Sequence, residues 1–384
     1  MRDELCQDII PFKIKISDEA IDDLKARLKN ARWPERATLS GWEQGVPLDY
    51  AIELMDYWRT DYNWRECEFY LNELPHFSTV IDNQEIAFIH VKSKHKEAKP
   101  LILTHGWPGS VIEFINVIKP LVNPVENGGS EKDAFHLVLP TIPGFGFAEK
   151  PSVNGWGIEK VASAWTELMR RLGYDSYYAQ GGDWGSAITT QIGISQGHAC
   201  KGIHINMALV HPSEGAKQNM SDFEKAALKG LDYYMQSDSG YSKIQSTKPQ
   251  TIGYGLVDSP VAQATWIIDK FWQWTDCRGD IENAVTRKHL FDNISFYWFS
   301  KAGASSARIY WESFNKVLTS NEEVLIPTGI SVFPKEIMRA SERWCRERYR
   351  NLVYYNQLPE GGHFAALEKP EGFVKELRSA FGEM

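Results

Sequence analysis

One acidic side chain, Asp183, stands in a run of small residues at 181–186 (GGDWGS). The apolar residues 177–179 precede this run and a helical pattern follows it, so the run joins a strand to a helix. A sharp turn of this kind needs small neighbours and pushes one side chain out beyond the strand. An aspartate carboxylate is ionised at neutral pH and can attack a saturated carbon directly. The run therefore predicts a nucleophile for alkyl transfer, although a glycine-rich turn with an N-capping aspartate has the same pattern.

A second loop offers backbone hydrogen-bond donors. It begins at His105-Gly106 and directly follows the apolar strand expected at 101–103. Amide N–H groups in such a loop, together with the one that follows a nucleophile, stabilise negative charge that develops on an oxygen atom. We expect the N–H groups of Trp107 and Trp184 to form this oxyanion hole. The side chain of His105 is expected to pack beneath the loop.

A base and its acidic partner are expected near the end of the chain. His363 follows a glycine pair after the last expected strand, which suits a base that activates water when the order is nucleophile, acid, histidine. Glu336 follows the penultimate strand and occupies the position of the acid. The competing position, after the strand at 203–205, offers Asn206 and no carboxylate before Glu214. Glu336 is therefore the preferred partner.

From residue 100 onward, short apolar strands alternate with helical patterns, which indicates a parallel sheet with crossover connections. Between 212 and 319 this alternation stops and several helices are expected, one of them at 261–274. The pattern predicts an α/β fold of the α/β-hydrolase type, with a mostly parallel central sheet and a helical lid. The strands are expected at 101–103, 137–139, 177–179, 203–205, 330–333 and 352–355, and further helices at 157–172, from 187 and from 370.

The first 95 residues have a different character. Ser17 is suited to cap a helix that ends at Trp33-Pro34, and a second amphipathic helix is expected at 49–64. The alternating stretch 77–91 predicts a hairpin that turns at Asp82-Asn83. The expected divisions are a helical N-terminal extension at 1–95, a core at 96–211 and 320–384, and a lid at 212–319.

The composition limits the classes of partner. A net charge of −8 argues against a general nucleic-acid binder. Aromatic residues make up 12% of the chain, which fits either a large core or an aromatic pocket for an apolar ligand. The five scattered cysteines include no CxxC pair, so reduced thiols are expected and a zinc site is not. Residues 1–15 carry frequent charges and no apolar run reaches the ~20 residues of a membrane span, so we expect a cytoplasmic protein without a membrane anchor.

Several segments along the chain have distinctive residue patterns: Pro11-Phe12-Lys13-Ile14, Arg32-Trp33-Pro34, Tyr57-Trp58-Arg59, Asp61-Tyr62-Asn63-Trp64-Arg65, Ser239-Gly240-Tyr241, residues 244–251, Asp258-Ser259-Pro260 and Trp266-Ile267. Through these segments, and over nearly its whole length, the sequence resembles the microsomal-type epoxide hydrolases, including their N-terminal domain. The resemblance implies that Asp183 forms a covalent ester with a small apolar epoxide and that His363, oriented by Glu336, activates the water that hydrolyses it. It implies no metal and no cofactor.

Members of this family use two lid tyrosines as acids toward the epoxide oxygen, and the matching positions are Tyr241 and Tyr310. A phenol with a pKa of ~10 remains protonated at neutral pH and can donate to a developing alkoxide. The resemblance also implies that Trp107 and Trp184 line the substrate site with these tyrosines. The family's microsomal members carry an N-terminal membrane anchor, which we do not expect here.

Two other functions share parts of this pattern. A haloalkane dehalogenase has the same fold and nucleophile, but its leaving halide needs no proton, so the tyrosines and the N-terminal domain favour an epoxide. A non-catalytic receptor of the same fold would be expected to lose part of the Asp–His–Glu set. The aromatic residues of 1–95, such as Trp42 and Trp58, need a partner surface to be buried. We expect this segment to clamp the lid over the sheet, with a homodimer interface as the alternative.

Overall fold

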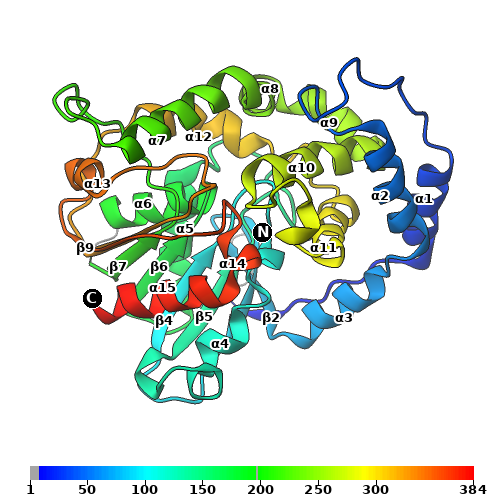
Figure 1. The fold of residues 1–384 in the computed structure, drawn as a ribbon. Helices are drawn as coiled ribbons and strands as arrows, with labels where there is room; N and C mark the ends of the chain where they lie inside the picture. Colours follow the sequence, from blue (N-terminus) through cyan, green and yellow to red (C-terminus); the bar gives the residue numbers. More distant parts are fainter. Residues whose placement is uncertain (1–7, 196–197) are drawn as a thin grey trace.

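The computed structural model describes residues 8–195 and 198–384, and a nine-stranded sheet runs through them (Figure 1). The strand order is β1-β2-β3-β5-β4-β6-β7-β8-β9. Strands β4 to β9 pair in parallel, whereas β1, β2 and β3 are antiparallel additions at one edge. The predicted α/β-hydrolase fold is confirmed. The strands are β1 Ile10–Pro11, β2 His76–Ile81, β3 Gln84–Val91, β4 Lys99–Thr104, β5 Phe135–Pro140, β6 Tyr177–Gly181, β7 Cys200–Ile205, β8 Thr328–Val332 and β9 Leu352–Gln357.

Helices cover both faces of the sheet. Helices α5 and α6 pack on each other against one face, and α4 and α15 lie on the other (Figure 1). In the same view the lid helices α7, α8, α9 and α12 lie along the top, and α10 and α11 lie below them to the right of the sheet. The helices are α1 Asp18–Lys29, α2 Leu48–Thr60, α3 Trp64–Glu73, α4 Ile118–Val122, α5 Ile158–Arg171, α6 Trp184–Ser195, α7 Asp222–Tyr233, α8 Gly240–Thr247, α9 Pro249–Asp258, α10 Pro260–Trp274, α11 Arg287–Phe299, α12 Arg308–Thr319, α13 Glu342–Arg348, α14 Ala365–Glu368 and α15 Pro370–Gly382.

Local sequence signals account for several of these elements. The Ser17 hydroxyl accepts a hydrogen bond from the Ala20 N–H and caps α1 as expected. The predicted hairpin is present as β2 and β3, and the φ angles of Asp82 and Asn83 are +49° and +61°. Two consecutive residues with positive φ form the turn whose twist matches that of the paired strands. This hairpin extends the central sheet, because β3 pairs with β5.

Three boundaries differ from the prediction. The helix expected at 49–64 is two helices, because the side chain of Asn63 accepts from the Arg65 N–H and starts α3 at Trp64. Helix α1 ends at Lys29, before Trp33-Pro34. Helix α6 begins at Trp184 and not at 187, so it starts directly after Asp183.

The N-terminal segment packs against lid helices through aromatic side chains. Trp58 Nε1 donates to Ser295 Oγ at 2.8 Å, and Tyr62 Oη donates to Asp292 Oδ1 at 2.9 Å, both on α11. The ring of Trp42 stacks on Trp272 of α10, with centroids 4.0 Å apart. Trp58 is therefore fully buried between the two parts of the chain. Other aromatics of the segment, such as Phe69, stay exposed.

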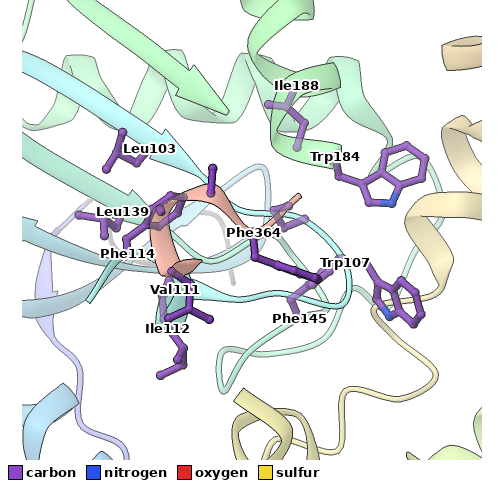
Figure 2. Close-up of a cluster of buried hydrophobic side chains, with 14 of the residues drawn as sticks. Leu103, Trp107, Val111, Ile112, Phe114, Leu139, Phe145, Trp184, Ile188 and Phe364 are labelled. Carbon is purple, nitrogen blue, oxygen red and sulfur yellow. The ribbon is translucent and has the colours of Figure 1, made fainter. Parts of the chain in front are cut away.

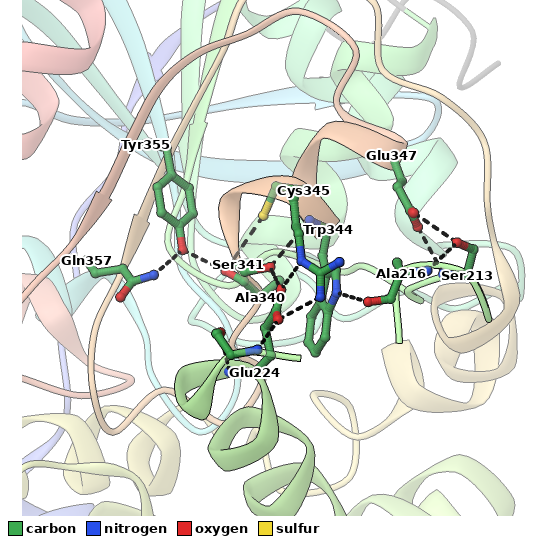
Figure 3. Close-up of polar contacts among 12 residues, drawn as sticks. Ser213, Ala216, Glu224, Ala340, Ser341, Trp344, Cys345, Glu347, Tyr355 and Gln357 are labelled. Atoms are coloured by element: carbon green, nitrogen blue, oxygen red, sulfur yellow. Dashed lines mark hydrogen bonds and ion pairs between the residues drawn. The ribbon is translucent and has the colours of Figure 1, made fainter. Parts of the chain in front are cut away.

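A buried carboxylate connects the start of the lid to the core (Figure 3). Glu224, on α7, is 1% exposed, and its Oε1 accepts from Ser341 Oγ at 2.5 Å and from Arg343 Nε at 2.6 Å. A second bond joins Glu224 Oε2 to Arg343 Nη2 at 2.7 Å. The Arg343 guanidinium therefore holds the pKa of Glu224 down at about 2, despite its burial. We call Glu224, Ser341 and Arg343 the lid anchor.

Apolar residues from the sheet, the loop after β4 and the turn before α14 form one cluster (Figure 2). Leu103 and Leu139 lie deep in it, whereas the rings of Trp107 and Trp184 lie at its edge. Cys67, Cys200, Cys277 and Cys345 are buried free thiols, and Cys6 lies outside the described residues. Within residues 8–195 and 198–384, no helix is long and apolar enough to cross a membrane.

Candidate active site

The backbone of Asp183 adopts a left-handed conformation, with φ +51°, between β6 and α6. This conformation is strained for a residue other than glycine and is typical of functional turns. A Cβ atom on Gly181 would collide with the carbonyl of Gly185, and one on Gly185 would collide with that of Thr104. The small residues around Asp183 are thus required by close backbone contacts.

The carboxylate of Asp183 faces the loop that follows β4. Its Oδ1 accepts a hydrogen bond from the Trp107 N–H at 2.7 Å. A side chain at Gly106 would overlap this carboxylate, so glycine is needed for the close approach. Trp184 opens α6, so its N–H is one of the first-turn amides that have no partner within a helix. The two expected backbone donors therefore flank the nucleophile candidate.

His363 lies between two carboxylates. Its Nδ1 is 2.7 Å from Glu336 Oε1, and its Nε2 is 3.4 Å from Asp183 Oδ2. Because a carboxylate only accepts, Nδ1 carries a proton and donates it to Glu336. Burial alone would lower the pKa of His363, but the charges of Glu336 and Asp183 outweigh it and raise this pKa well above its usual value.

The loop that carries His363 is held by several hydrogen bonds. The His363 N–H donates to the Trp274 carbonyl of the lid at 2.9 Å. Glu368 accepts from the Phe364 N–H at 3.0 Å and from the Asp276 N–H at 2.8 Å, and burial raises its pKa to about 7. A Cβ on Gly362 would collide with the Trp274 carbonyl, which explains a glycine before the histidine.

The alternative acid position holds no carboxylate. Asn206 is buried, and its Oδ1 accepts from Gln180 Nε2 at 2.9 Å. Glu214 pairs with Lys217 in an exposed position. His105 is buried beneath its loop as expected, where its Nε2 accepts from the Ile142 N–H at 3.2 Å and burial lowers its pKa to about 4.

The two lid tyrosines face Asp183 across a cavity of about 60 Å³. Tyr241 stacks on Trp107, with ring centroids 4.8 Å apart, and Tyr310 meets Trp184 edge to face at 4.7 Å. The centroids of the two tyrosines are 5.8 Å apart. Burial raises the pKa of both phenols well above its usual value, so both stay protonated at neutral pH.

The sequence did not identify two polar residues of this site. Tyr234 lines the same cavity, and its hydroxyl lies 3.0 Å from that of Tyr241. Glu113 follows the loop after β4, and burial raises its pKa to about 8 against the opposing effect of His363. Its carboxylate fills the space that a side chain at Gly109 would need. In the sequence, the only residue that points to a buried side chain at Glu113 is Gly109, because its lack of a side chain leaves room for the carboxylate.

Comparisons with known proteins show which families this chain matches. Residues 9–114 match the family model described as epoxide hydrolase N terminus, and residues 99–370 match that of the alpha/beta hydrolase fold. The chain is 48% identical to a Stigmatella aurantiaca protein with a provisional epoxide hydrolase designation, over 98% of this chain and 85% of that protein. It is 35% identical to epoxide hydrolase 1 of Sus scrofa, over 98% of this chain and 89% of that protein.

Two solved structures extend the likeness to three dimensions. The juvenile hormone epoxide hydrolase of the silkworm Bombyx mori superposes with a TM-score of 0.90 at 32% identity, covering 98% of this chain and 94% of that chain. The epoxide hydrolase of Aspergillus niger gives a TM-score of 0.87 at 29% identity, covering 98% and 96%. Sequence and structure agree over almost the whole chain, and the protein therefore belongs to the epoxide hydrolase family of the α/β-hydrolase fold.

Proposed function

We propose that this protein adds water to a small apolar epoxide and releases a vicinal diol, through an ester on Asp183. One observation carries the proposal: the Asp183 carboxylate lies between the His363 imidazole and the cavity, beneath two protonated phenols. The apolar part of the cavity wall includes Leu209 and Phe314, which suit a hydrocarbon substituent on the epoxide.

In the first step, an oxygen of Asp183 bonds to an epoxide carbon. The carbon–oxygen bond of the ring breaks, and its electron pair goes to the epoxide oxygen. A proton from Tyr241 or Tyr310 neutralises that oxygen, which leaves one tyrosine as a phenolate. The Trp107 N–H holds Asp183 Oδ1 at 2.7 Å, which leaves Oδ2 as the attacking atom.

In the second step, His363 Nε2 takes a proton from water while the hydroxide adds to the ester carbon of Asp183. The N–H groups of Trp107 and Trp184 stabilise the resulting oxyanion. His363 then returns its proton to the departing diol oxygen. The second hydrogen of the water remains on the regenerated Asp183 carboxyl and balances the proton that the tyrosine gave up. Because the ester carries no charge, its formation lowers the pKa of His363 and turns it into a base.

The remaining assignments concern the chain as a whole. We place an N-terminal domain at 1–95, the hydrolase core at 96–211 and 320–384, and the lid at 212–319. The contacts of Trp58 and Trp42 with lid helices favour a clamp over a homodimer interface for the N-terminal domain. Four buried free thiols among the described residues suit a cytoplasmic protein.

Mass spectrometry of a His363→Ala variant tests the function. With styrene oxide as the probe, the variant is expected to accumulate a stable adduct whose added mass equals that of the epoxide. Asp183→Asn is the matched variant, and it should form no adduct. A wild-type enzyme that releases bromide from 1-bromobutane but leaves the epoxide unchanged would favour a dehalogenase instead. Absence of both activities together with tight epoxide binding would favour a receptor.

A further inference from the structure

A further carboxyl group, that of Glu113, borders the active site and has no part in the two steps above. Glu113 lies in the short 3-10 turn Val111–Phe114, which follows the loop after β4. A Cβ atom on Gly109 would overlap Glu113 Oε1, so the side chain folds back over this loop. Burial raises the pKa of the carboxyl group to about 8, so most of it is protonated at pH 7. The protein therefore holds a neutral carboxyl group at the edge of the site.

Glu113 and Asp183 are held by the same short stretch of backbone. A hydrogen bond with the Gly106 backbone favours the ionised form of Glu113, which identifies the Gly106 N–H as the donor. The next N–H along the chain, that of Trp107, donates to Asp183 Oδ1 at 2.7 Å. A Cβ on Gly106 would overlap the Asp183 carboxylate, just as one on Gly109 would overlap Glu113. Two consecutive amides and two glycines of one loop thus accommodate both acids.

The turn that carries Glu113 also packs against the segment that carries the base. Helix α14 begins two residues after His363 and contacts this turn. Of the charges that act on Glu113, that of His363 favours ionisation of the carboxyl group most strongly, which requires the two groups to be near each other. The close-up in Figure 2 draws apolar side chains of both segments in one cluster, among them Val111, Ile112 and Phe364.

Charged and titratable groups face Glu113 from several elements. Asp183, from the turn before α6, and Glu336, from the segment after β8, oppose its ionisation, whereas His363 favours it. Tyr297, on lid helix α11, lies close enough that a charge on Glu113 would raise the pKa of its phenol. Burial outweighs the effect of His363, so Glu113 stays neutral while Asp183 and Glu336 carry the negative charges.

Glu113 keeps some accessible surface in spite of its position. The residue is only half-buried, and the Asp183 side chain is 13% exposed. A raised pKa and partial access agree if the carboxyl group borders a space inside the protein that admits a molecule as small as water. Water is the second substrate of the proposed reaction, and it must reach His363 Nε2 beside the ester on Asp183.

From these contacts, and resting on the proposed epoxide hydrolase function, we propose that Glu113 binds the hydrolytic water together with His363. His363 Nε2 accepts one hydrogen of this water, and the carbonyl oxygen of the Glu113 carboxyl group accepts the other. Nε2 then removes the first proton as the water oxygen bonds to the ester carbon. The second hydrogen stays on that oxygen, so Glu113 neither gains nor loses a proton. Its neutral form suits this role, because a further carboxylate would oppose the negative charge that develops on the ester oxygen.

Single-turnover kinetics separate the water-dependent step from ring opening. With enzyme in excess over styrene oxide, rapid quenching and mass detection follow the formation and the decay of the Asp183 adduct. Glu113→Met has a side chain of similar length without the carbonyl acceptor, and it is expected to slow the decay roughly 10- to 100-fold, the effect of losing one hydrogen bond in a polar site. Formation of the adduct should stay near the wild-type rate, because water takes no part in it.

Glu113→Gln restores the acceptor, because its amide oxygen occupies the same place, and it should recover most of the decay rate at pH 7. In the wild type the decay should slow at alkaline pH, where Glu113 loses its proton and becomes a carboxylate. The charges of Asp183 and His363 are both lost in the ester, so burial still keeps the pKa of Glu113 high. Glu113→Gln cannot ionise, and its decay rate should stay constant between pH 7 and 10. A purely structural role would not produce this difference in pH profile.

Glu131→Met is the matched control, since Glu131 lies in another 3-10 turn of the connection between β4 and β5 and its side chain is 80% exposed. It should change neither step. A wild-type decay rate in Glu113→Met would overturn the assignment, as would equal slowing of formation and decay. Identical pH profiles of decay in Glu113→Gln and the wild type would overturn it too, even if Glu113→Met failed to fold. Failure of the function itself looks different, because no adduct would then form in the wild type or in His363→Ala.

Discussion

Trp58 of the N-terminal segment donates from Nε1 to Ser295 Oγ of lid helix α11 at a distance of 2.8 Å, and both side chains are buried. The bond joins residues 237 positions apart in the chain. It places the N-terminal segment in direct contact with the lid, which in turn holds Tyr241 and Tyr310 over Asp183. The position of the lid is therefore expected to depend on residues 1–74, before the hairpin begins.

Truncation tests this dependence. Deletion of residues 1–74 retains β2 and β3 but removes the short edge strand β1, and it exposes the lid surface around Ser295. The truncated protein is expected to be insoluble or to lack a cooperative unfolding transition by circular dichroism. Trp58→Phe should lower the free energy of unfolding by ~1–2 kcal/mol, through the unpaired Ser295 hydroxyl. Trp33→Phe, at a more exposed site, is the control. A truncated monomer that unfolds cooperatively with full turnover would show that the clamp hypothesis is wrong.

The lid anchor should make stability depend on acidity. The pKa of Glu224 in the folded protein is about 2, below the ordinary value of 4.5. The stabilisation is therefore complete above pH ~5 and is lost as the pH falls toward 2. Glu224→Gln should lower the free energy of unfolding at pH 7 by roughly 1–3 kcal/mol, and the difference from wild type should shrink over that range. Glu214→Gln, at an exposed ion pair, should have no such effect. A difference that is constant between pH 7 and 3 would contradict the anchor.

Glu336 is expected to affect only the second half-reaction. Its charge is the main cause that raises the pKa of His363 against burial, so Glu336→Gln should lower this pKa. Hydrolysis of the ester requires neutral His363. The fall in the hydrolysis rate at acidic pH should therefore begin at a lower pH in the variant than in the wild type. The rate itself should fall roughly 10²- to 10⁴-fold, because the amide no longer fixes the imidazole tautomer. Stopped-flow measurement of both steps checks this, with Glu360→Gln as an exposed control. An equal loss in ring opening would contradict the assigned role.

Removal of both lid phenols should nearly abolish ring opening. Tyr241→Phe and Tyr310→Phe should each slow adduct formation, and the double variant should lose the proton donor altogether, a loss of ~10²- to 10⁴-fold or more. Thermal unfolding should change little, since each phenylalanine keeps the ring contacts with Trp107 and Trp184. Full activity in the double variant would require another acid in the cavity.

Some of these features could be predicted from the sequence because their signals are local. Asp183 and His363 stand in glycine-rich turns whose spacing follows from close backbone contacts, and the Asp82-Asn83 turn follows from its own residue types. The break between α2 and α3 also has a local signal, because Asn63 is a residue type that caps helices. The signal is easily missed, since the amphipathic pattern of the predicted helix continues to Trp64.

Other features depend on contacts between distant segments. The π-helical turn Tyr234–Asp238 and its contacts with Tyr241 require α10 to place Lys270 against the same ring, and no local pattern predicts that. Glu113 is unremarkable in the sequence, and its raised pKa arises from burial near Asp183 and His363. The pairing of β3 with β5 likewise comes from the tertiary fold.

The covalent ester on Asp183 is the central claim, and a single turnover in water labelled with ¹⁸O tests it most directly. With enzyme in excess over styrene oxide, the oxygen added to the product comes from the Asp183 carboxylate, and the oxygen of water replaces it there. The account predicts an unlabelled diol and one ¹⁸O atom in the proteolytic peptide that contains Asp183. A labelled diol together with an unlabelled Asp183 peptide would mean that water attacks the epoxide directly, and would contradict the account.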